Sequence, residues 1–560
     1  MKKKIFKKLS LGALALTMIL NTTPLHTQAA DIGMKVLKGH NTNNVITLRD
    51  KPIEVPSQMI QKEEQFRGVW VSTVYNLDFP SKKGINQEKY KAEYISMLNN
   101  LEDLNMNSVI FQVRPKLDAF YKSEINPWSE YLSGTQGKSP GWDPMEWMIE
   151  ETHKRGMEFH AWFNPYRVTT ATENKKSIKQ ELQSLSENNW ARQNPQYVYR
   201  YEGKLQLNPG EPKVIEHINK SVMEVVENYD VDAIHFDDYF YPFKKNNNFY
   251  FSGEKATFDK YKGEFNSIDD WRRNNVDSLV EQLNTSISEY NTKEGKNVQF
   301  GISPFAIWGH EGNPKIAKVG QGSRTPMSSG ASYDQQFADT RKWVKNNWVD
   351  YIAPQVYWTF DQKAAPYGEI VHWWTEVVKD TDVNLYIGHA NYKIKESKSN
   401  SSWKNPHELC NQLNFNSKYD EVKGSIFFRY KDLLKSAKGN SENDKFIDML
   451  KRDHFNTKAS LPNKPVLKTE TLFANITKDI NGNIITWKDN IEENENYTIY
   501  REKLDSADKV VEKVEIKTVE GTKDSSAYLY FDKDIVKDEK YRYHISANKG
   551  GQQTKVAYAK

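Results

Sequence analysis

The sequence contains one cysteine, Cys410, among 560 residues. A single thiol cannot close an internal disulfide, so the folded chain has to depend on a large apolar core, which this length allows. The sequence also has no glycine-rich phosphate loop, no His-Glu-x-x-His helix motif and no cysteine cluster. These absences argue against phosphorylated ligands, zinc-dependent hydrolysis and cysteine nucleophiles, and we expect no cofactor.

Long hydrophobic runs are also missing, apart from one short apolar stretch at residues 9–20. Five lysines precede this stretch, and a polar segment ending in the small residues of 27–30 follows it. That three-part pattern predicts a secretory signal peptide over residues 1–30, because the apolar stretch is too short to cross a bilayer as a helix. A retained membrane anchor is the alternative. Without a second segment of spanning length, we expect no stable membrane insertion after the signal is cleaved.

The chain has no surplus of basic residues once the predicted leader is set aside. The full sequence carries a net charge of +4, and the leader holds five lysines and no acidic residue, which leaves the remainder near −1. A nucleic-acid-binding surface needs excess cations to neutralise phosphates, so nucleic acid is not an expected partner. An exported chain of this size without disulfides suits a bacterial protein that is secreted or associated with the cell envelope, and we expect a monomer.

One sequence pattern is repeated between residues 62 and 455. A short run rich in β-branched and aromatic residues ends in polar residues, and an amphipathic helical pattern follows after a loop. Runs of this kind occupy residues 67–73, 107–115, 157–167, 231–238, 298–305, 349–358, 383–392 and 423–430. Helical patterns between them include 87–104 and 143–156. The second begins with Asp143 as a predicted N-cap and Pro144 at the first helical position.

Eight strand-then-helix units predict an α/β fold, a (β/α)8 TIM barrel with enlarged loops over residues 62–455. The alternative is a doubly wound open sheet. The barrel is favoured because the units number eight and because polar residues recur at the C-terminal end of each run. In a barrel those ends form one face, and active sites are built on that face. Residues 31–61 are then a polar lead-in to the barrel.

The last hundred residues have a different sequence pattern. A linker is predicted over 456–468, and short alternating segments separated by Asn, Asp and Gly fill 469–560. This pattern predicts a β-sandwich, and the spacing of Trp487, Tyr500 and Tyr541 resembles that of fibronectin type III domains. Two roles are open for this domain: a module that binds carbohydrate or cell wall, or a spacer that packs on the barrel.

Candidate ligand-binding residues come from the ends of the predicted barrel strands. Carboxylates, amides and aromatic rings predominate there, and they suit a neutral polyhydroxylated ligand, because acids and amides bond hydroxyl groups while rings cover C–H surfaces. A polysaccharide is therefore the expected partner. The candidate substrate-binding residues are Arg114, Asp118, Trp162, Asn164, Arg167, Tyr239, Trp308, Gln355, Tyr357, Trp358, Asn391 and Arg429.

Asp237 and Asp238 are adjacent at the end of the fourth apolar run. Two neighbouring carboxyl groups cannot both ionise cheaply, so one of them is expected to have a raised pKa. A protonated acid beside a charged partner is what glycosidic cleavage requires, and we predict that this pair is catalytic. The alternative is a structural role, either in an ion pair with Arg114, Arg167 or Arg429 or in capping the next helix.

Three histidines, His160, His235 and His389, lie on separate predicted strands that a barrel brings together. They are conceivable metal ligands. A histidine within a β-strand is more often hydrogen-bonded to a neighbour across the barrel, and we predict that role for them and no metal site.

Several sequence blocks resemble the bacterial glycosyl hydrolase-like 10 family. They begin with FRGVWVSTV at 66–74 and include FDDYFYP at 236–242. The remaining blocks are QVRPKLDAFY at 112–121, PWSEYLSG at 127–134, AWFNPYR at 161–167, LNPGEP at 207–212, GISPFAIW at 301–308 and APQVYW at 353–358. Members of this family are exported barrels, often with an appended fibronectin-like domain, and are similar to a divisome-associated hydrolase of peptidoglycan glycan strands.

The resemblance implies an endo-acting glycosidase on N-acetylglucosamine/N-acetylmuramic acid strands from which the stem peptides have been removed. It also implies a mechanism, because adjacent acids after the fourth strand are similar to the pair in substrate-assisted N-acetylhexosaminidases. By that analogy Asp237 orients the substrate's acetamido group, which attacks the anomeric carbon, and Asp238 is the acid/base. Alternative second carboxylates come from loops: Asp118, Glu311, Asp334 and Asp361.

Supporting roles follow by position within the same analogy. Tyr239 and Tyr357 are expected to bond the acetamido oxygen or the developing charge. Arg114 and Arg167 have two open roles, binding the lactyl carboxylate of muramic acid or offsetting the aspartates. Rings that can stack on sugars are Trp70, Trp162, Trp308 and Trp358, with Trp70 more typical of barrel filling.

Two other functions remain open from the sequence. One is a barrel without catalytic activity that binds wall polysaccharide and uses its C-terminal domain to scaffold other proteins. The other is a hydrolase of a different extracellular polymer, such as poly-N-acetylglucosamine or a host glycan. The enzyme is favoured because a binding-only barrel has no need of paired acids.

Overall fold

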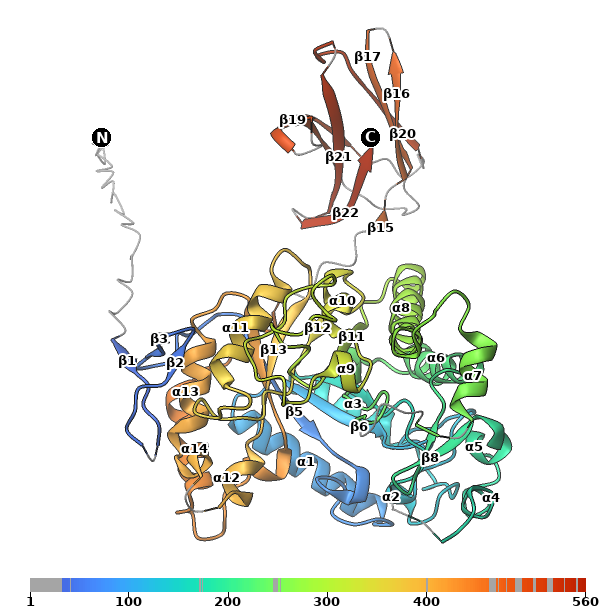
Figure 1. The fold of residues 1–560 in the computed structure, drawn as a ribbon, viewed down its shortest axis with the longest axis vertical. Helices are drawn as coiled ribbons and strands as arrows, with labels where there is room; N and C mark the ends of the chain where they lie inside the picture. Colours follow the sequence, from blue (N-terminus) through green and yellow to red (C-terminus); the bar gives the residue numbers. More distant parts are fainter. Residues whose placement is uncertain are drawn as a thin grey trace, which may run out of the picture.

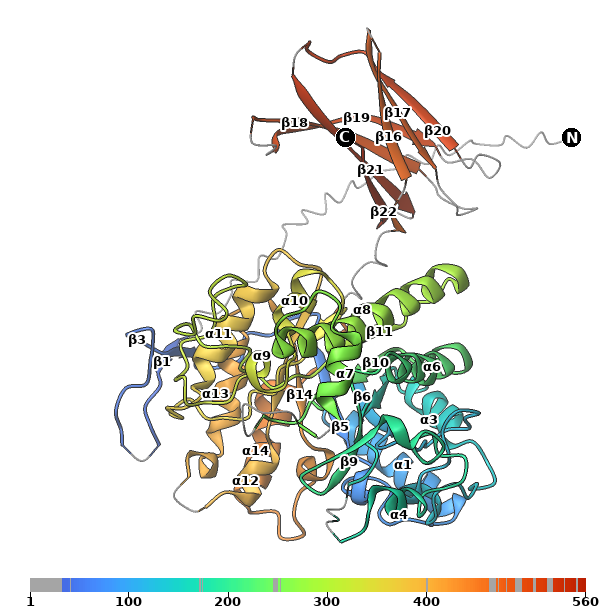
Figure 2. The same cartoon turned by 45° about the vertical axis from the view of Figure 1, so that its right-hand side comes forward.

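The computed structural model (Figures 1 and 2) describes residues 33–559 with internal gaps. The gaps are 41, 171–172, 174, 245–249, 252, 399–400, 463–469, 472, 480, 489–495, 507–509, 521–526, 538 and 550–551. The predicted signal peptide and part of the predicted linker lie outside the described residues, so both stay predictions. No helix in the part of the chain that the structure describes combines the length and apolar character needed to cross a bilayer.

Eight parallel strands close into a barrel, which confirms the predicted (β/α)8 fold (Figure 1). Around the barrel the order is β10, β11, β12, β13, β14, β5, β6 and β7, so the first strand of the barrel pairs with the last. The strands are β5 (Phe66–Val71), β6 (Ser108–Arg114), β7 (Glu158–Phe163), β10 (Ala233–Phe236), β11 (Gln299–Ile302), β12 (Tyr351–Ile352), β13 (Asn384–His389) and β14 (Val422–Phe427). Nearly every strand residue is buried, because helices cover the outside and side chains fill the inside.

Helices surround the barrel, and the two helical patterns singled out in the sequence are both present. The pattern at 87–104 forms α1 (Gln87–Asp103), and that at 143–156 forms α3 (Pro144–His153). Asp143 caps α3 by accepting a hydrogen bond from the Met145 backbone N–H. The other α-helices are α2 (Glu130–Ser133), α4 (Ile178–Leu182), α5 (Trp190–Gln193), α6 (Pro212–Asn228), α7 (Glu254–Tyr261), α8 (Ile268–Glu294), α9 (Ser332–Gln335), α10 (Thr340–Lys345), α11 (Tyr367–Val378), α12 (Tyr392–Glu396), α13 (His407–Asn416) and α14 (Glu442–Met449).

Short elements decorate the barrel on its loops and at its start. The lead-in contributes two strand pairs, β1 (Met34–Val36) with β4 (Glu54–Pro56) and β2 (Thr47–Leu48) with β3 (Lys51–Pro52). A hairpin, β8 (Val198–Tyr201) and β9 (Lys204–Leu207), follows β7. Short helical turns are η1 (Val74–Asn76), η2 (Pro195–Tyr197), η3 (Ser402–Lys404), η4 (Tyr430–Leu433) and η5 (Leu450–His454).

The inside of the barrel is a packed aromatic layer and not a pore. Phe66 stacks on Tyr386 with ring centroids 4.1 Å apart, and Tyr351 lies beside both rings. Tyr351 fits because the facing residue on β11 is Gly301, where an added Cβ would lie 2.0 Å from the tyrosine ring. This filling closes the barrel below its C-terminal face, so any ligand has to bind above the layer.

The C-terminal strands form two sheets, as a β-sandwich requires. One sheet has the order β15-β22-β21-β18-β19 and the other β16-β17-β20. Their bounds are β15 (Glu470–Thr471), β16 (Phe473–Asp479), β17 (Gly482–Lys488), β18 (Asn496–Leu504), β19 (Val510–Glu520), β20 (Ala527–Asp532), β21 (Lys540–Lys549) and β22 (Gln552–Ala559). Trp487 and Ile485 of one sheet share a core with Tyr497 and Tyr543 of the other. The finer fibronectin type III assignment stays a prediction.

Replacing Gly301 with alanine tests the packing of the barrel interior. We expect Gly301→Ala to lower the free energy of unfolding by roughly 1–3 kcal/mol, because the new methyl group has to displace the Tyr351 ring. Denaturant unfolding monitored by circular dichroism measures the change. Gly312→Ala is the matched control, since an added Cβ there meets no atom within 4 Å. Equal stability of the two variants would contradict this account of the packed layer.

Candidate active site

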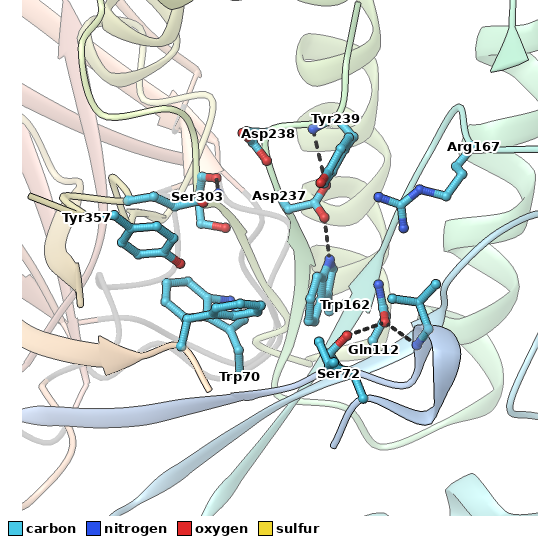
Figure 3. Close-up of a pocket in the computed structure, with 14 residues that line it drawn as sticks. Trp70, Ser72, Gln112, Trp162, Arg167, Asp237, Asp238, Tyr239, Ser303 and Tyr357 are labelled. Atoms are coloured by element: carbon cyan, nitrogen blue, oxygen red, sulfur yellow. Dashed lines mark hydrogen bonds between the residues drawn. The ribbon is translucent and has the colours of Figure 1, made fainter. Parts of the chain in front are cut away.

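A cavity of about 290 Å³ opens at the C-terminal ends of the barrel strands (Figure 3). Residues from β5, β6 and β7 and from the segments that follow β5, β7, β10, β11, β12 and β14 line it, so it lies on the face where barrels build active sites. The lining residues are Trp70, Ser72, Val74, Leu77, Gln112, Trp162, Arg167, Asp237, Asp238, Tyr239, Ser303, Gln355, Tyr357 and Phe428.

Asp237 is 4% exposed and is held by three N–H donors. Its Oδ2 accepts hydrogen bonds from Trp162 Nε1, at 3.1 Å, and from Asn164 Nδ2. Its Oδ1 accepts from the backbone N–H of Tyr239 at 3.2 Å. A carboxylate can only accept, whereas a carboxylic acid needs an acceptor for its proton. Three donors and no acceptor therefore stabilise the ionised form of Asp237.

Burial raises the pKa of both carboxyl groups of the pair. The charge of Asp238 raises the pKa of Asp237 further, and the nearby Arg167 guanidinium acts in the opposite direction. The pair consequently retains a proton at a pH at which ordinary carboxyl groups have lost theirs. Three N–H donors favour the ionised form of Asp237, and side-chain hydrogen bonds from Gln355 and Gln336 oppose the rise in the pKa of Asp238, which is half-buried and lines the cavity.

A chain of amides fixes the position of Asp237. Asn164 donates to Asp237 through Nδ2, and its Oδ1 accepts from Gln112 Nε2 at 2.6 Å. Gln112 in turn accepts from the backbone N–H groups of Thr73 and Val74, both at 2.9 Å. These contacts link the loop after β5 to the catalytic face through β6 and β7, so the orientation of Asp237 depends on three strands.

Buried histidines form a second chain below the cavity. Trp70 Nε1 donates to His235 Nε2 at 3.1 Å, and an indole N–H is a donor only, so the proton of His235 is on Nδ1. That Nδ1 lies 2.9 Å from Tyr351 Oη, which lies 2.9 Å from His160 Nδ1. His160 Nε2 then faces a Glu158 carboxylate oxygen at 3.0 Å. Burial lowers the pKa of His235 well below its usual value, which agrees with a neutral ring.

The hydrogen bonds of the three histidines are also relevant to the alternative that they bind a metal ion. His160 and His235 are bonded across the barrel as described, and His389 contacts Gln412 and Ser425, each at 3.1 Å. The prediction of bonds across the barrel is confirmed for His160 and His235, whereas His389 bonds a residue of α13 and one of the adjacent strand β14. Among the described residues, no group of three or more His, Cys, Asp or Glu side chains is arranged to hold a metal ion.

Seven of the fourteen residues proposed for the site meet in the cavity. They are Asp237, Asp238, Trp162, Arg167, Tyr239, Gln355 and Tyr357. Asn164 is fully buried and joins them through its hydrogen bond to Asp237. The hydroxyl of Tyr357 is directed into the cavity (Figure 3), and burial raises its pKa well above the usual value, so it is a hydrogen-bond donor at any physiological pH.

Three other candidates lie away from the cavity surface. Arg114 is 0% exposed and donates to the carbonyl oxygens of Asn164 and Pro165. Asp118 is buried against Lys116, with Nζ 3.4 Å from Oδ2. Trp308 is 1% exposed, stacks on a neighbouring indole and bonds Asp339. None of the three is among the residues that line the cavity, so their contact with a sugar stays a prediction.

The last three candidates are also not among the residues that line the cavity. Trp358 is half-buried and packs edge-to-face with Phe305, at 5.5 Å between ring centroids. Asn391 is buried and donates to the carbonyl oxygen of Arg429 at 3.1 Å. The guanidinium of Arg429 is 2.9 Å from Asp432, so it offsets a different acid from the one expected.

The alternative second carboxylates form contacts outside the cavity, and the ion pairs considered for the two aspartates are not formed among the described residues. Glu311 pairs with an arginine at 3.1 Å, Asp334 accepts from Asn313 at 2.5 Å, and Asp361 accepts from two hydroxyl groups. None of these three carboxylates is among the residues that line the cavity. Within the described chain, neither Asp237 nor Asp238 forms an ion pair with the three arginines considered. The adjacent aspartates are therefore the acid pair that the cavity presents.

The sequence reasoning left out part of the cavity wall. Gln112 and Ser303 are polar residues at strand ends that are not among the candidates. Trp70 was considered as a stacking ring but interpreted as more typical of barrel filling, and it lines the cavity. Val74, Leu77 and Phe428 are apolar loop residues. Nothing in a single sequence separates such residues from ordinary packing, since their role depends on where the loop places them.

The fold and the site together indicate the class of protein. Adjacent acids, amides and aromatic rings in a cavity at the C-terminal face of a (β/α)8 barrel are typical of glycoside hydrolases. The sequence matches the family described as Glycosyl hydrolase-like 10 over residues 65–405. The chain belongs to that family, as the sequence blocks indicated.

Relatives with curated descriptions agree with this assignment. The chain is 39% identical over 498 residues to Glycosyl hydrolase YngK of Bacillus subtilis, which covers 87% of this chain and 91% of that protein. It is 38% identical over 393 residues to Glycosyl hydrolase DigH of Escherichia coli K12, covering 67% and 85%. Among solved structures, it is similar to the PgaB (BpsB) glycoside hydrolase domain of Bordetella bronchiseptica, with a TM-score of 0.40, 10% identity and coverage of 65% and 94%.

Removing one oxygen atom tests the buried histidine chain. We expect Tyr351→Phe to lower the free energy of unfolding by about 3 kcal/mol, because it leaves His235 Nδ1 and His160 Nδ1 without their shared partner. Thermal unfolding followed by calorimetry measures the change. Tyr75→Phe, at a tyrosine that is 60% exposed, is the control and should be neutral. A neutral Tyr351→Phe would show that the bonds are not formed as described.

Proposed function

We propose that this protein hydrolyses glycosidic bonds in N-acetylhexosamine-containing cell-wall glycan, with peptide-free peptidoglycan strands as the substrate. The observation that carries the proposal is the asymmetry of the aspartate pair. Asp237 is buried and surrounded by N–H donors, whereas Asp238 is half-buried at the cavity wall, where a leaving group can reach it. In the proposed reaction the proton that the pair retains is on Asp238. A fixed carboxylate beside a protonated acid is what substrate-assisted cleavage of an N-acetylhexosaminide requires.

The first chemical step uses both aspartates. Asp237 has one oxygen, Oδ1, with a single recorded donor, and this oxygen accepts the N–H of the substrate's acetamido group. The acetamido oxygen attacks the anomeric carbon as the bond from that carbon to the leaving oxygen breaks. Asp238 gives its proton to the leaving oxygen, which departs as an alcohol. Tyr357, with its hydroxyl directed into the cavity, donates a hydrogen bond to the acetamido oxygen.

The second step reverses the role of Asp238. The carboxylate left after the first step accepts a proton from a water molecule, and that water attacks the anomeric carbon. The bond between this carbon and the acetamido oxygen breaks, and the acetamido group is restored. Two displacements on the same carbon give a product with retained configuration. The rings of Trp70 and Trp162 on the cavity wall supply apolar faces for the sugar.

We propose further that the protein acts outside the cytoplasm, as a secreted or envelope-associated monomer. The lysine-rich start, short apolar stretch and small residues at 27–30 support export. A cell-wall substrate is consistent with that location. For the C-terminal β-sandwich we keep both roles open, a wall-binding module or a spacer.

Substituting Asp238 tests the proposed reaction. We expect Asp238→Asn to lower the rate of product release from amidase-stripped peptidoglycan by roughly 10²–10⁴-fold, because an amide cannot protonate the leaving oxygen. Mass spectrometry of the soluble products measures release from stripped and intact peptidoglycan. Asp103→Asn, at an exposed carboxylate far from the cavity, is the matched control and should release products like the wild type.

Three outcomes would count against this proposal. If the wild type releases nothing but sediments with the glycan, the protein is a binding scaffold. If the wild type cleaves poly-N-acetylglucosamine or another polymer and leaves peptidoglycan intact, the substrate is wrong. If Asp238→Asn keeps full activity, the acid has been assigned to the wrong residue.

The pH dependence of kcat tests the asymmetry of the pair. Activity should rise as Asp237 ionises and fall as Asp238 loses its proton, and both limbs should lie above the usual carboxyl range because burial raises both pKa values. Trp162→Phe removes a donor to ionised Asp237, so its pKa rises and the ascending limb moves up by about one pH unit. Rate profiles of both proteins between pH 4 and 9 measure this, and an unmoved ascending limb contradicts it.

A further inference from the structure

Arg167 places a positive charge in the wall of the cavity, and in the described part of the chain it forms no ion pair. The residue follows β7 and lines the cavity together with both aspartates. Its guanidinium extends toward Asp237 in Figure 3, and its charge acts on the pKa of that residue, but the two are not in direct contact. An arginine beside two acids normally closes on one of them. Here it is held away.

Three contacts hold the guanidinium in place. Nη1 donates to the carbonyl oxygen of Pro115 at 3.2 Å and to Asn164 Oδ1 at 2.9 Å. The guanidinium carbon lies 4.3 Å from the centroid of the Tyr239 ring, which fixes the plane of the group. A guanidinium has five N–H donors, and the two bonds of Nη1 together with a side-chain hydrogen bond to Tyr239 leave donors for a ligand. The group is pre-organised for a planar anion.

Asn164 sets the spacing between Arg167 and Asp237. Its Oδ1 accepts from Arg167 and its Nδ2 donates to Asp237 Oδ2, so one amide group lies between the two charges. Asn164 is fully buried and is fixed from the other side by Gln112. The cavity therefore presents an acceptor, Asp237, and a cation, Arg167, side by side at a constant distance.

We propose that Arg167 binds a carboxylate carried by the same sugar whose acetamido group is held by Asp237. This inference rests on the proposed function. In an N-acetylhexosamine the acetamido group is on C2, and the neighbouring ring position is C3. Muramic acid carries its lactyl carboxylate through an ether on C3, so the two substituents are adjacent as Asp237 and Arg167 are. Planar bidentate binding of a carboxylate is what a fixed guanidinium does best.

Two consequences follow for specificity. The sugar whose anomeric bond breaks is then the muramic acid residue, so the new reducing end is muramic acid and not glucosamine. A stem peptide joined to the lactyl group converts its carboxylate to a neutral amide, which removes the charge that Arg167 binds. Preference for peptide-free strands would therefore come from one residue. Arg114, the other arginine considered for this role, is fully buried and has no access to the ligand.

The competing role for Arg167 is to offset the charge of the aspartates. In that role its loss would weaken cleavage of every substrate to the same extent and would shift the pH profile. In the proposed role the larger part of its effect is lost only when the substrate carries a carboxylate. Glycan strands in which the lactyl carboxyl has been chemically reduced to an alcohol separate the two roles.

The experiment compares the wild type with Arg167→Gln and Arg167→Lys on amidase-stripped strands and on carboxyl-reduced strands. We expect Arg167→Gln to lower kcat/KM about 10–100-fold more on the stripped strands than on the reduced strands, mainly through KM, because the loss of its effect on Asp237 is common to both glycans. Arg167→Lys keeps the positive charge but loses the planar donor geometry of the guanidinium. Its kcat/KM on stripped strands should lie between those of the wild type and Arg167→Gln. Borohydride labelling of products followed by mass spectrometry should identify muramic acid at the new reducing end.

Arg452→Gln, at a side chain that is 70% exposed on the surface, is the matched control and should match the wild type on both glycans. Equal losses by Arg167→Gln on both glycans would overturn the inference and assign Arg167 to the aspartates. A glucosamine reducing end would overturn the placement of muramic acid while leaving the proposed hydrolase intact. If the wild type cleaves neither glycan, the proposed function itself fails, and the inference fails with it.

Discussion

Two carboxyl groups at the end of an apolar barrel strand dominate the energetics of this site. Burial disfavours their charged forms, and adjacency disfavours charging both. The protein meets this constraint by treating the two residues differently. Asp237 receives N–H donors from an indole, an amide and the backbone, while Asp238 is left at the cavity wall. The two carboxyl groups therefore differ in their surroundings and in their access to a ligand.

The donors to Asp237 are themselves fixed by the packing below and beside them. Asn164 is positioned by Gln112, and Gln112 is held by backbone N–H groups of the loop after β5. Deeper in the barrel, Tyr351 connects two histidines in a chain that begins at Trp70 of the cavity wall. Each polar group in these chains has a partner on another strand. Buried networks of this kind favour a single arrangement, because breaking one bond leaves a buried group unsatisfied.

Local patterns in the sequence predicted the barrel, since eight apolar runs with polar ends require eight strands whose C-terminal ends share a face. The aspartate pair was also predictable. Charging two adjacent acids after a buried strand costs free energy, so their presence there indicates a specific role. Trp308 shows where this reasoning stops. It follows a strand like the cavity residues do, yet it stacks on Trp373 and bonds Asp339 in the core. Whether an aromatic residue after a strand contacts ligand or core depends on loop paths that one sequence does not specify.

The sequence by itself determined the eight-unit architecture, the acid pair and the class of residues around it, because these depend on local composition and periodicity. Only the tertiary structure decided which N–H donors Asp237 receives, since they come from β7, from the residue after it and from the backbone after β10. It also decided between two similar arginines. Arg114 is fully buried and Arg167 reaches the cavity, a difference set by contacts between residues far apart in the chain.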